Sequence, residues 1–227
     1  MNAFTSIDTV ASPVNRAYAS IRESILSLQY APKQALRAQE LSDELKLSRT
    51  PVREALARLE KDGLVLRDSG WGYVVRDFSL TEAMNLYKVR EALEVEAISE
   101  AIGNADDSVI TLLTGILDRA EAALKQNRPN EFLATCRRFH ELIAHTTANG
   151  ILEDMIETIS GQVRLVSALV IRERGERATD VLGENRRILQ AIKKKDREAA
   201  IGAVRHHIKL AGENLFVYFT SAVSRKR

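Results

Sequence analysis

The chain has 227 residues, of which 45% are hydrophobic and 28% are charged, a balance typical of a folded globular protein. It has only 4 Pro and 11 Gly, so a mostly helical fold is favoured. It contains no run of eighteen apolar residues that could span a membrane, and its first residues do not resemble a signal peptide. A single cysteine excludes an intramolecular disulfide and favours a reducing compartment, so we expect a cytoplasmic protein.

Net charge does not indicate a partner. The formal value is +2, and residues 1–78 carry 11 Lys and Arg against 10 Asp and Glu. Many DNA-binding domains are plainly basic, and this composition alone would not identify one. Any argument for a nucleic-acid partner must therefore rest on the positions of particular residues.

The first part of the chain predicts a small mixed domain. Residues 1–12 have no hydrophobic periodicity and are predicted to form a flexible tail. Helices are predicted at about 13–28, 38–45 and 49–61; Ser48 is the expected N-cap of the third, and Gly63 follows its end. Two β-rich runs, 64–67 and 72–75, flank a polar turn and predict a hairpin, the only strand signal in the chain. This order of elements, within residues 13–78, is that of a winged helix-turn-helix.

The rest of the chain predicts a second domain, residues 79–227, that is entirely helical. Ser79 and Glu82 have the spacing of a capping box, which marks the start of its first helix. Amphipathic helices are predicted at about 81–102, 106–127, 130–148, 150–173, 177–195 and 196–222. The first two carry predicted core stripes that include Val89 and Leu112. Such helices can bury one core as an antiparallel six-helix bundle.

The helix predicted at 49–61 has one apolar face and one polar face. On a helical wheel, Val52, Ala55 and Leu59 cluster on the side that must pack inward. The other side carries small and basic residues: Arg49, Thr50, Arg53 and Ala57. This layout suits entry into a DNA major groove, where arginine binds guanine edges or phosphates. The alternative is an ordinary solvent-exposed helix face that carries some arginines. The combination of this helix with the turn and the hairpin favours DNA binding.

The segment 41–59, followed by Asp62-Gly63-Leu64, resembles the winged helix-turn-helix of the GntR family. Its most specific part is Ser-Arg-Thr-Pro-Val-Arg-Glu-Ala-Leu at 48–56. The chain departs from the family at Pro32-Lys33, where Pro-Gly is usual. The resemblance implies operator contacts from the helix and the wing, through Ser48, Arg49, Thr50, Pro51, Arg53, Ser69 and Gly70.

In the helical domain, the helical wheel places polar or soft groups on otherwise apolar faces. Cys136 and His140 project together from one helix, Asn185 turns inward from another, and His207 does so from the last. Buried polar groups need partners, so we expect these side chains to meet at one site. Each residue alone has an ordinary interpretation as a core side chain. His145 and His206 lie off these faces, and we assign them no role.

The helix order and the contexts of these residues resemble the FadR-type C-terminal domain, most closely its VanR subgroup, over about residues 80–222. Many members bind a divalent metal through one Asp and three His. In this chain Cys136 occupies the position of the Asp and Asn185 that of the second His. His140 and His207 occupy the positions of the other two His residues. Cys136, His140 and His207 could therefore hold Zn²⁺. The alternative is a metal-free pocket in which His140, Asn185 and His207 hydrogen-bond the effector directly.

Arg90 is a further candidate for effector binding. It lies beside a predicted core face, in a run that resembles the first helix of these effector domains, and an arginine there could clamp a carboxylate. An ion pair with Glu94, four residues along the same helix, is the alternative.

Three functions are compatible with these observations. The favoured one is a dimeric, DNA-binding transcription regulator that reads a short palindrome and is controlled by a small molecule in the helical domain. The resemblance implies that it is a repressor and that the small molecule is an organic acid. A zinc-dependent enzyme fused to a DNA-binding module is disfavoured, because no general base or nucleophile motif accompanies Cys136 and His140. An architectural DNA-binding dimer without a ligand would require a filled bundle core.

Overall fold

The computed structural model describes residues 12–70 and 72–224, so the predicted tail lies almost wholly outside the described residues. The chain divides into two compact units, Met1–Asp77 and Phe78–Arg227. This boundary falls one residue before the one that the sequence predicts.

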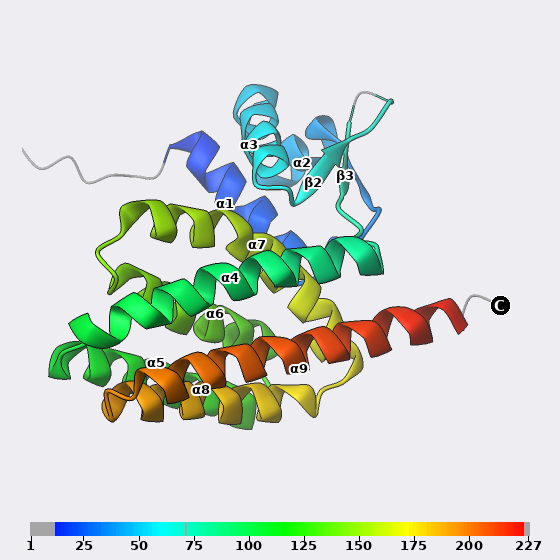
Figure 1. The fold of residues 1–227 in the computed structure, drawn as a ribbon. Helices are drawn as coiled ribbons and strands as arrows, with labels where there is room; N and C mark the ends of the chain where they lie inside the picture. Colours follow the sequence, from blue (N-terminus) through cyan, green and yellow to red (C-terminus); the bar gives the residue numbers. More distant parts are fainter. Residues whose placement is uncertain (1–11, 71, 225–227) are drawn as a thin grey trace, which may run out of the picture. The chain divides into compact units, whose positions relative to one another are not determined.

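The first unit contains three helices and three short strands in its described part (Figure 1). They are α1 (Pro13–Leu26), β1 (Ala35–Leu36), α2 (Ala38–Leu45), α3 (Arg49–Lys61), β2 (Val65–Arg67) and β3 (Tyr73–Val75). The apolar faces of the helices meet in one core, whose fully buried members include Ala17, Ile21, Ile25, Val52, Ala55, Leu56 and Leu59. The predicted helices and hairpin of a winged helix-turn-helix are confirmed.

The strand β1 corrects the prediction that the hairpin is the only β-structure. It pairs antiparallel with β3, through Ala35 with Val74 and Leu36 with Tyr73, which gives the sheet order β1-β3-β2. Two residues are too few to show the alternating pattern by which a strand is recognised in a sequence. The pairing therefore depends on tertiary contact with the hairpin.

The ends of α2 and α3 follow the predicted turn chemistry in part. Gly63 has φ 70°, a left-handed conformation that glycine adopts without strain, and it follows the last turn of α3. Lys46 ends α2 with φ 52°. Ser48 occupies the N-cap position of α3 as predicted, but its side chain makes no capping hydrogen bond.

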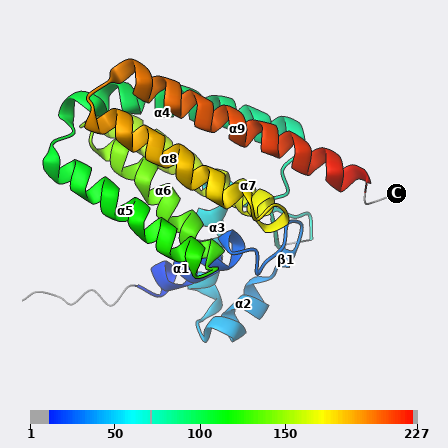
Figure 2. The ribbon, with the colours of Figure 1, turned by 90° about the horizontal axis from the view of Figure 1, so that it is seen from below.

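The second unit is helical throughout its described part (Figures 1 and 2). Its helices are α4 (Leu80–Asn104), α5 (Asp107–Lys125), α6 (Pro129–His145), α7 (Gly150–Glu173), α8 (Arg177–Lys193) and α9 (Arg197–Ser224). The capping box at the start of α4 is confirmed, because Ser79 Oγ accepts from the Glu82 N–H while the Glu82 carboxylate accepts from the Ser79 N–H. In both views α9 runs alongside α4 and α8, and α6 packs against α4, α5, α7 and α8. None of the described helices is long and apolar enough to cross a membrane.

Two residues predicted on core stripes face solvent instead. Val89 on α4 is 50% exposed and Leu112 on α5 is 57% exposed. The helix α4 is turned so that Tyr87, Arg90 and Glu94 face inward in place of Val89. A wheel drawn from hydrophobicity cannot anticipate that a helix buries an ion pair, because the free energy of that burial depends on partners from other helices.

Candidate functional site

The exposed face of α3 carries the residues that its sequence pattern indicates. Val52, Ala55 and Leu59 are fully buried, whereas the polar side of the helix is exposed at Arg49, Thr50, Arg53 and Ala57. Among the described residues, no acidic side chain forms a salt bridge with Arg49 or Arg53. Arginines that are exposed on one face of a helix can bind phosphates or guanine edges.

The N-terminus of α3 adds backbone donors to this face. Ser48 is exposed and Pro51 is half-buried in the first turn, so the unbonded N–H groups of that turn are available to an anion. In the wing, the predicted contact residues Ser69 and Gly70 are both exposed. The structure thus leaves six of the seven predicted DNA-contact residues exposed on the first unit, and Pro51 is half-buried.

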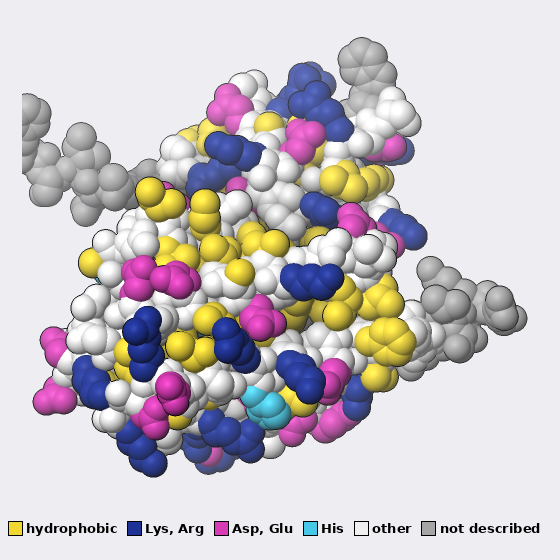
Figure 3. Space-filling view, in the orientation of Figure 1, with side chains coloured by type: hydrophobic (Ala, Val, Ile, Leu, Met, Phe, Trp, Pro, Cys, Tyr) yellow, Lys and Arg dark blue, Asp and Glu magenta, His cyan; other side chains and the backbone are white. Residues whose placement is uncertain are grey.

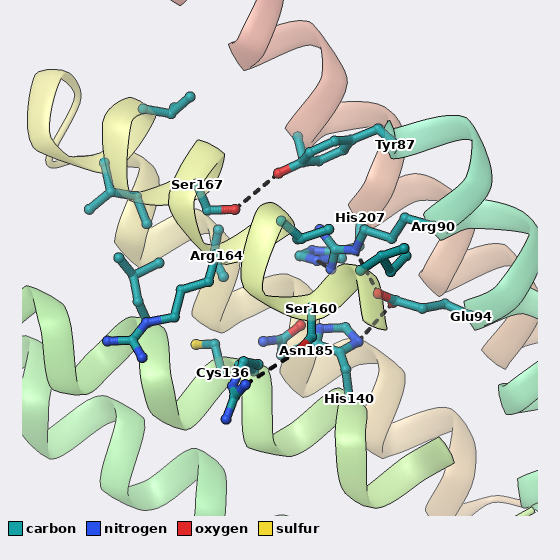
Figure 4. Close-up of a pocket in the computed structure, with 18 of the residues that line it drawn as sticks. Tyr87, Arg90, Glu94, Cys136, His140, Ser160, Arg164, Ser167, Asn185 and His207 are labelled. Carbon is teal, nitrogen blue, oxygen red and sulfur yellow. Dashed lines mark hydrogen bonds and ion pairs between the residues drawn. The ribbon is translucent and has the colours of Figure 1, made fainter. Parts of the chain in front are cut away.

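A cavity of about 100 Å³ lies inside the helical unit, lined by residues from α4, α6, α7, α8 and α9 (Figure 4). All the residues that the sequence singled out in this unit line it: Arg90, Cys136, His140, Asn185 and His207. Each comes from the inward face of a long helix, which is why residues up to 117 positions apart in sequence can meet. Their convergence at one cavity, expected from the helical wheels, is found in the structure.

Arg90 and Glu94 form a buried ion pair on α4 that extends to both histidines. Arg90 Nε donates to Glu94 Oε1 at 2.6 Å, and Arg90 Nη2 lies 3.1 Å from His207 Nε2. The other carboxylate oxygen, Glu94 Oε2, lies 2.8 Å from His140 Nδ1. Although burial acts in the opposite direction, Arg90 and His140 hold the pKa of Glu94 well below its usual range. The carboxylate is therefore ionised and fixes the orientation of both neighbours.

His207 is oriented from its other side by α8. Its Nδ1 lies 2.7 Å from Glu184 Oε2, and Glu184 also accepts two hydrogen bonds from Arg177, at 2.5 and 2.7 Å. Burial lowers the pKa of His207 to about 4, although the hydrogen bond to Glu184 acts to raise it. His207 is therefore neutral at pH 7, with its proton on Nδ1 facing the carboxylate and Nε2 accepting from Arg90.

Sequence reasoning missed several buried charged residues of the helical unit. Glu184 and Arg177 on α8 are only 3% and 4% exposed, and Arg164 on α7 is 5% exposed. The spacing of Arg177 and Glu184, seven residues apart, places them on one face of α8 and was an available signal. Nothing in the sequence of α7 distinguishes Arg164 from a solvated residue, because its burial depends on the packing of α7 against the bundle.

Asn185 places a buried amide at the wall of the cavity. Apart from the thiol of Cys136, no described residue offers its Oδ1 or Nδ2 a hydrogen-bond partner. The nearby thiol of Cys136 has its pKa raised to about 12 by burial, an effect that the Asn185 amide and Arg90 partly oppose. Buried amides normally find partners, so an amide at a cavity wall to whose Oδ1 no described residue donates indicates a ligand-binding position.

The arrangement of these side chains does not match the zinc site considered from the sequence. Across residues 12–70 and 72–224, no group of three or more His, Cys, Asp and Glu side chains is arranged to hold a metal ion. His207 Nε2, the nitrogen that a metal would need, accepts from the guanidinium of Arg90. Asn185 contributes a neutral amide, which is a poor zinc ligand. The arrangement fits direct recognition by side chains instead.

Comparison with known families decides the identity of both units. The family described as "Bacterial regulatory proteins, gntR family" matches residues 13–75, and the FCD domain family matches residues 85–210. The chain belongs to the GntR family of bacterial transcription regulators. Its helical unit is an FCD domain, the effector-binding domain of such regulators, so the chain is a DNA-binding regulator and not an enzyme.

Relatives and solved structures agree with this family. The regulator YdhC of Bacillus subtilis is 29% identical over 200 residues, covering 87% of this chain and 88% of that protein. The repressor RspR of Escherichia coli is 25% identical over 204 residues, which is 89% of each chain. The structure of E. coli McbR/YncC superimposes with a TM-score of 0.82 at 20% identity, covering 92% of this chain and all of that one. This last likeness supports the fold alone.

Proposed function

We propose that this regulator is a homodimeric repressor that leaves its operator when a small carboxylate binds in the FCD cavity without a metal ion. The observation that carries the effector part is the cavity itself, because it combines buried charged groups with the buried amide of Asn185, to whose Oδ1 no described residue donates. A core built only for dimerisation would be filled, which disfavours an architectural protein without a ligand.

Two observations support a carboxylate effector. Arg90 and Arg164 both line the cavity, and both are almost fully buried. A guanidinium binds a carboxylate through directed, charge-assisted hydrogen bonds that strengthen away from water. His140, Asn185 and His207 would complete the contacts, as the metal-free alternative from the sequence requires. Removal of metal with EDTA is therefore expected to leave effector binding unchanged.

The DNA-binding half of the proposal rests on α3 and the wing. Ser48, Thr50 and the first N–H groups of α3 would hold phosphates, and Arg49 and Arg53 would reach phosphates or base edges. Pro51 would pack its ring against the sugar-phosphate backbone, with Ser69 and Gly70 of the wing touching an adjacent groove. A repressor role is supported by the relative RspR, whose name describes a repressor.

Pairing of two copies is supported by exposed apolar side chains on adjacent helices of the FCD domain. Val89 on α4 is 50% exposed, and Phe216 and Val217 on α9 are 55% and 44% exposed. Figure 3 shows hydrophobic side chains over the C-terminal part of α9. Large exposed apolar side chains grouped in this way are typical of an interaction surface. A twofold pair would present two winged domains to the two halves of a short palindrome.

The experiment that tests this function begins with selection of duplexes from a random pool by the full-length protein. Binding of the selected duplex is then followed by fluorescence anisotropy. We expect two chains per palindromic duplex and a loss of affinity of roughly tenfold or more for Arg53→Ala, because one good arginine contact to a base contributes about 1–3 kcal/mol.

Lys61→Ala is the matched control for this experiment, since it removes the same charge from the other end of α3. It should leave affinity for the selected duplex nearly unchanged. Circular dichroism establishes that both variants are folded. Undiminished affinity of a folded Arg53→Ala variant would falsify the assignment of α3 as the recognition helix.

A further inference from the structure

The FCD cavity has room for a small organic ligand. About 100 Å³ is available inside it, several times the roughly 10–15 Å³ that a single water molecule needs. If this cavity binds a small carboxylate, as the proposed function holds, its polar side chains also restrict which other group the ligand carries.

The side chain of Arg90 offers only hydrogen-bond donors to the cavity. Arg90 has five N–H groups and no acceptor, and it directs Nε toward Glu94 and Nη2 toward His207. A carboxylate is likewise only an acceptor, so it matches this guanidinium. It cannot satisfy any group in the cavity that needs to accept a hydrogen bond.

Asn185, in contrast, needs a hydrogen-bond donor from the ligand. Its amide has two donors on Nδ2 and an acceptor at Oδ1; the Cys136 thiol interacts with this amide as an acceptor, and no described residue donates to Oδ1. A carboxylate could accept from Nδ2, but Oδ1 would then lie buried beside a negative charge without a donor. Leaving a buried acceptor unpaired is unfavourable by more than a typical hydrogen bond contributes. The ligand must therefore also bring an O–H or N–H group.

His140 lies beside Glu94 at the cavity wall. Its Nδ1 lies 2.8 Å from the ionised Glu94 carboxylate, which holds the imidazole proton on that nitrogen. In the neutral ring the remaining nitrogen, Nε2, accepts hydrogen bonds. A ligand group that both donates and accepts would suit His140 and Asn185 together, whereas an ammonium group would add positive charge beside the arginines. A hydroxyl group meets both conditions.

We infer that the effector is a small hydroxy acid, whose carboxylate accepts hydrogen bonds from Arg90 and whose hydroxyl donates to the buried amide oxygen of Asn185. Side chains of the protein bind the hydroxy acid directly, and no metal ion bridges ligand and protein. Specificity for the hydroxyl arises because the acid that lacks it leaves Asn185 Oδ1 buried and unpaired.

The test uses pairs of acids that differ by one hydroxyl: lactate and propionate, malate and succinate, and 3-hydroxybutyrate and butyrate. Thermal shift and isothermal titration calorimetry measure binding to the full-length protein in the presence of EDTA. We expect one hydroxy acid to bind roughly tenfold more tightly than its partner, while 1,2-propanediol, which lacks a carboxylate, gives no shift.

Asn185→Leu removes both the donor and the acceptor at similar volume. We expect this variant to melt no lower than the wild type without ligand, and to bind both members of the preferred pair with equal, weak affinity. Ser167→Ala, which removes a cavity hydroxyl already bonded to Tyr87, is the control and should keep the preference.

The outcomes distinguish failure of the hydroxy-acid inference from failure of the proposed function. Equal binding of both acids in every pair, or a preference that survives in Asn185→Leu, overturns the hydroxy-acid inference and leaves a carboxylate effector in place. If no acid shifts the melting temperature of the wild type, the proposed carboxylate effector is overturned as well. If EDTA abolishes binding and Zn²⁺ restores it, recognition without a metal is overturned.

Discussion

His207 connects two buried ion pairs that belong to different helices. On one side Glu184 accepts from its Nδ1, and on the other Arg90 donates to its Nε2. This bridging position requires a neutral ring with one donor and one acceptor nitrogen, which is the state that burial favours. The residue therefore has a structural role in addition to any contact with the effector.

The environment of His207 predicts a specific dependence of stability on pH. Burial lowers its pKa from 6.5 to about 4 in the folded protein. Between these values the unfolded chain binds more protons than the folded one, so the free energy of unfolding decreases as pH falls from about 6.5 to 4. Thermal unfolding measured from pH 6.5 to pH 4 should show a falling melting temperature.

His207→Gln tests the origin of this effect, because an amide can donate to Glu184 and accept from Arg90 without titrating. We expect a flatter profile of melting temperature against pH for this variant between 6.5 and 4. The exposed neighbour His206, changed to Gln, should retain the wild-type profile. A wild-type slope in His207→Gln would contradict the assignment.

At the scale of single residues, the sequence predicted more than it usually can. Cys136, His140, Asn185 and His207 were placed inward by helical periodicity alone, because long helices keep a regular phase. Arg90 had two open interpretations, and its ion pair with Glu94 is present while it also lines the cavity. Glu184 and Arg177 could not be predicted with the same ease, since buried charges contradict the pattern by which a core face is recognised.

At the scale of elements, α8 depends on a buried ion pair near its start. Arg177 and Glu184 lie seven residues apart on one face of the helix, and both are nearly inaccessible to solvent. The pair also reaches α9, because Glu184 accepts from His207. Such a pair contributes less to net stability than to the geometry that it enforces, but removing one partner leaves a buried charge without compensation.

Glu184→Leu is therefore expected to lower the free energy of unfolding by about 3–5 kcal/mol, as measured by urea denaturation. Glu184→Gln keeps hydrogen-bonding capacity and should be less destabilising. Glu121→Gln, which breaks surface pairs with Arg186 and Lys125, is the control and should change the midpoint little. An unchanged midpoint in Glu184→Leu would show that the pair is not a structural requirement of α8.

Element boundaries followed local signals wherever a cap or a helix breaker was present. Ser79 with Glu82, Pro129 and Gly63 each stand at an end that the structure confirms. The strand β1 was missed because its two residues carry no pattern of their own, and the rotation of α4 was missed because Arg90 and Glu94 are buried. Both exceptions arise from tertiary contacts that no local window contains.

At the scale of the whole molecule, the regulator has two functional units with separate chemistry. One presents basic and hydroxyl side chains on α3, and the other encloses a cavity among five helices. Control of one by the other requires that the effector binds two states of the regulator with different affinity, since a ligand with equal affinity for both shifts nothing. The polar cluster of Arg90, Glu94, His207 and Glu184 links α4, α8 and α9 and is suited to respond to a ligand.

We propose that side chains of the FCD cavity, without a metal ion, control the affinity of α3 for DNA. This is tested most directly by anisotropy of the selected duplex with wild type and Asn185→Leu, in EDTA, as the hydroxy acid preferred in the thermal screen is added. We expect the acid to lower the DNA affinity of the wild type at least tenfold, on the order of 1.4 kcal/mol of coupling, and to leave that of Asn185→Leu unchanged. DNA affinity that the acid does not alter in the wild type, or alters equally in both proteins, would contradict this proposal.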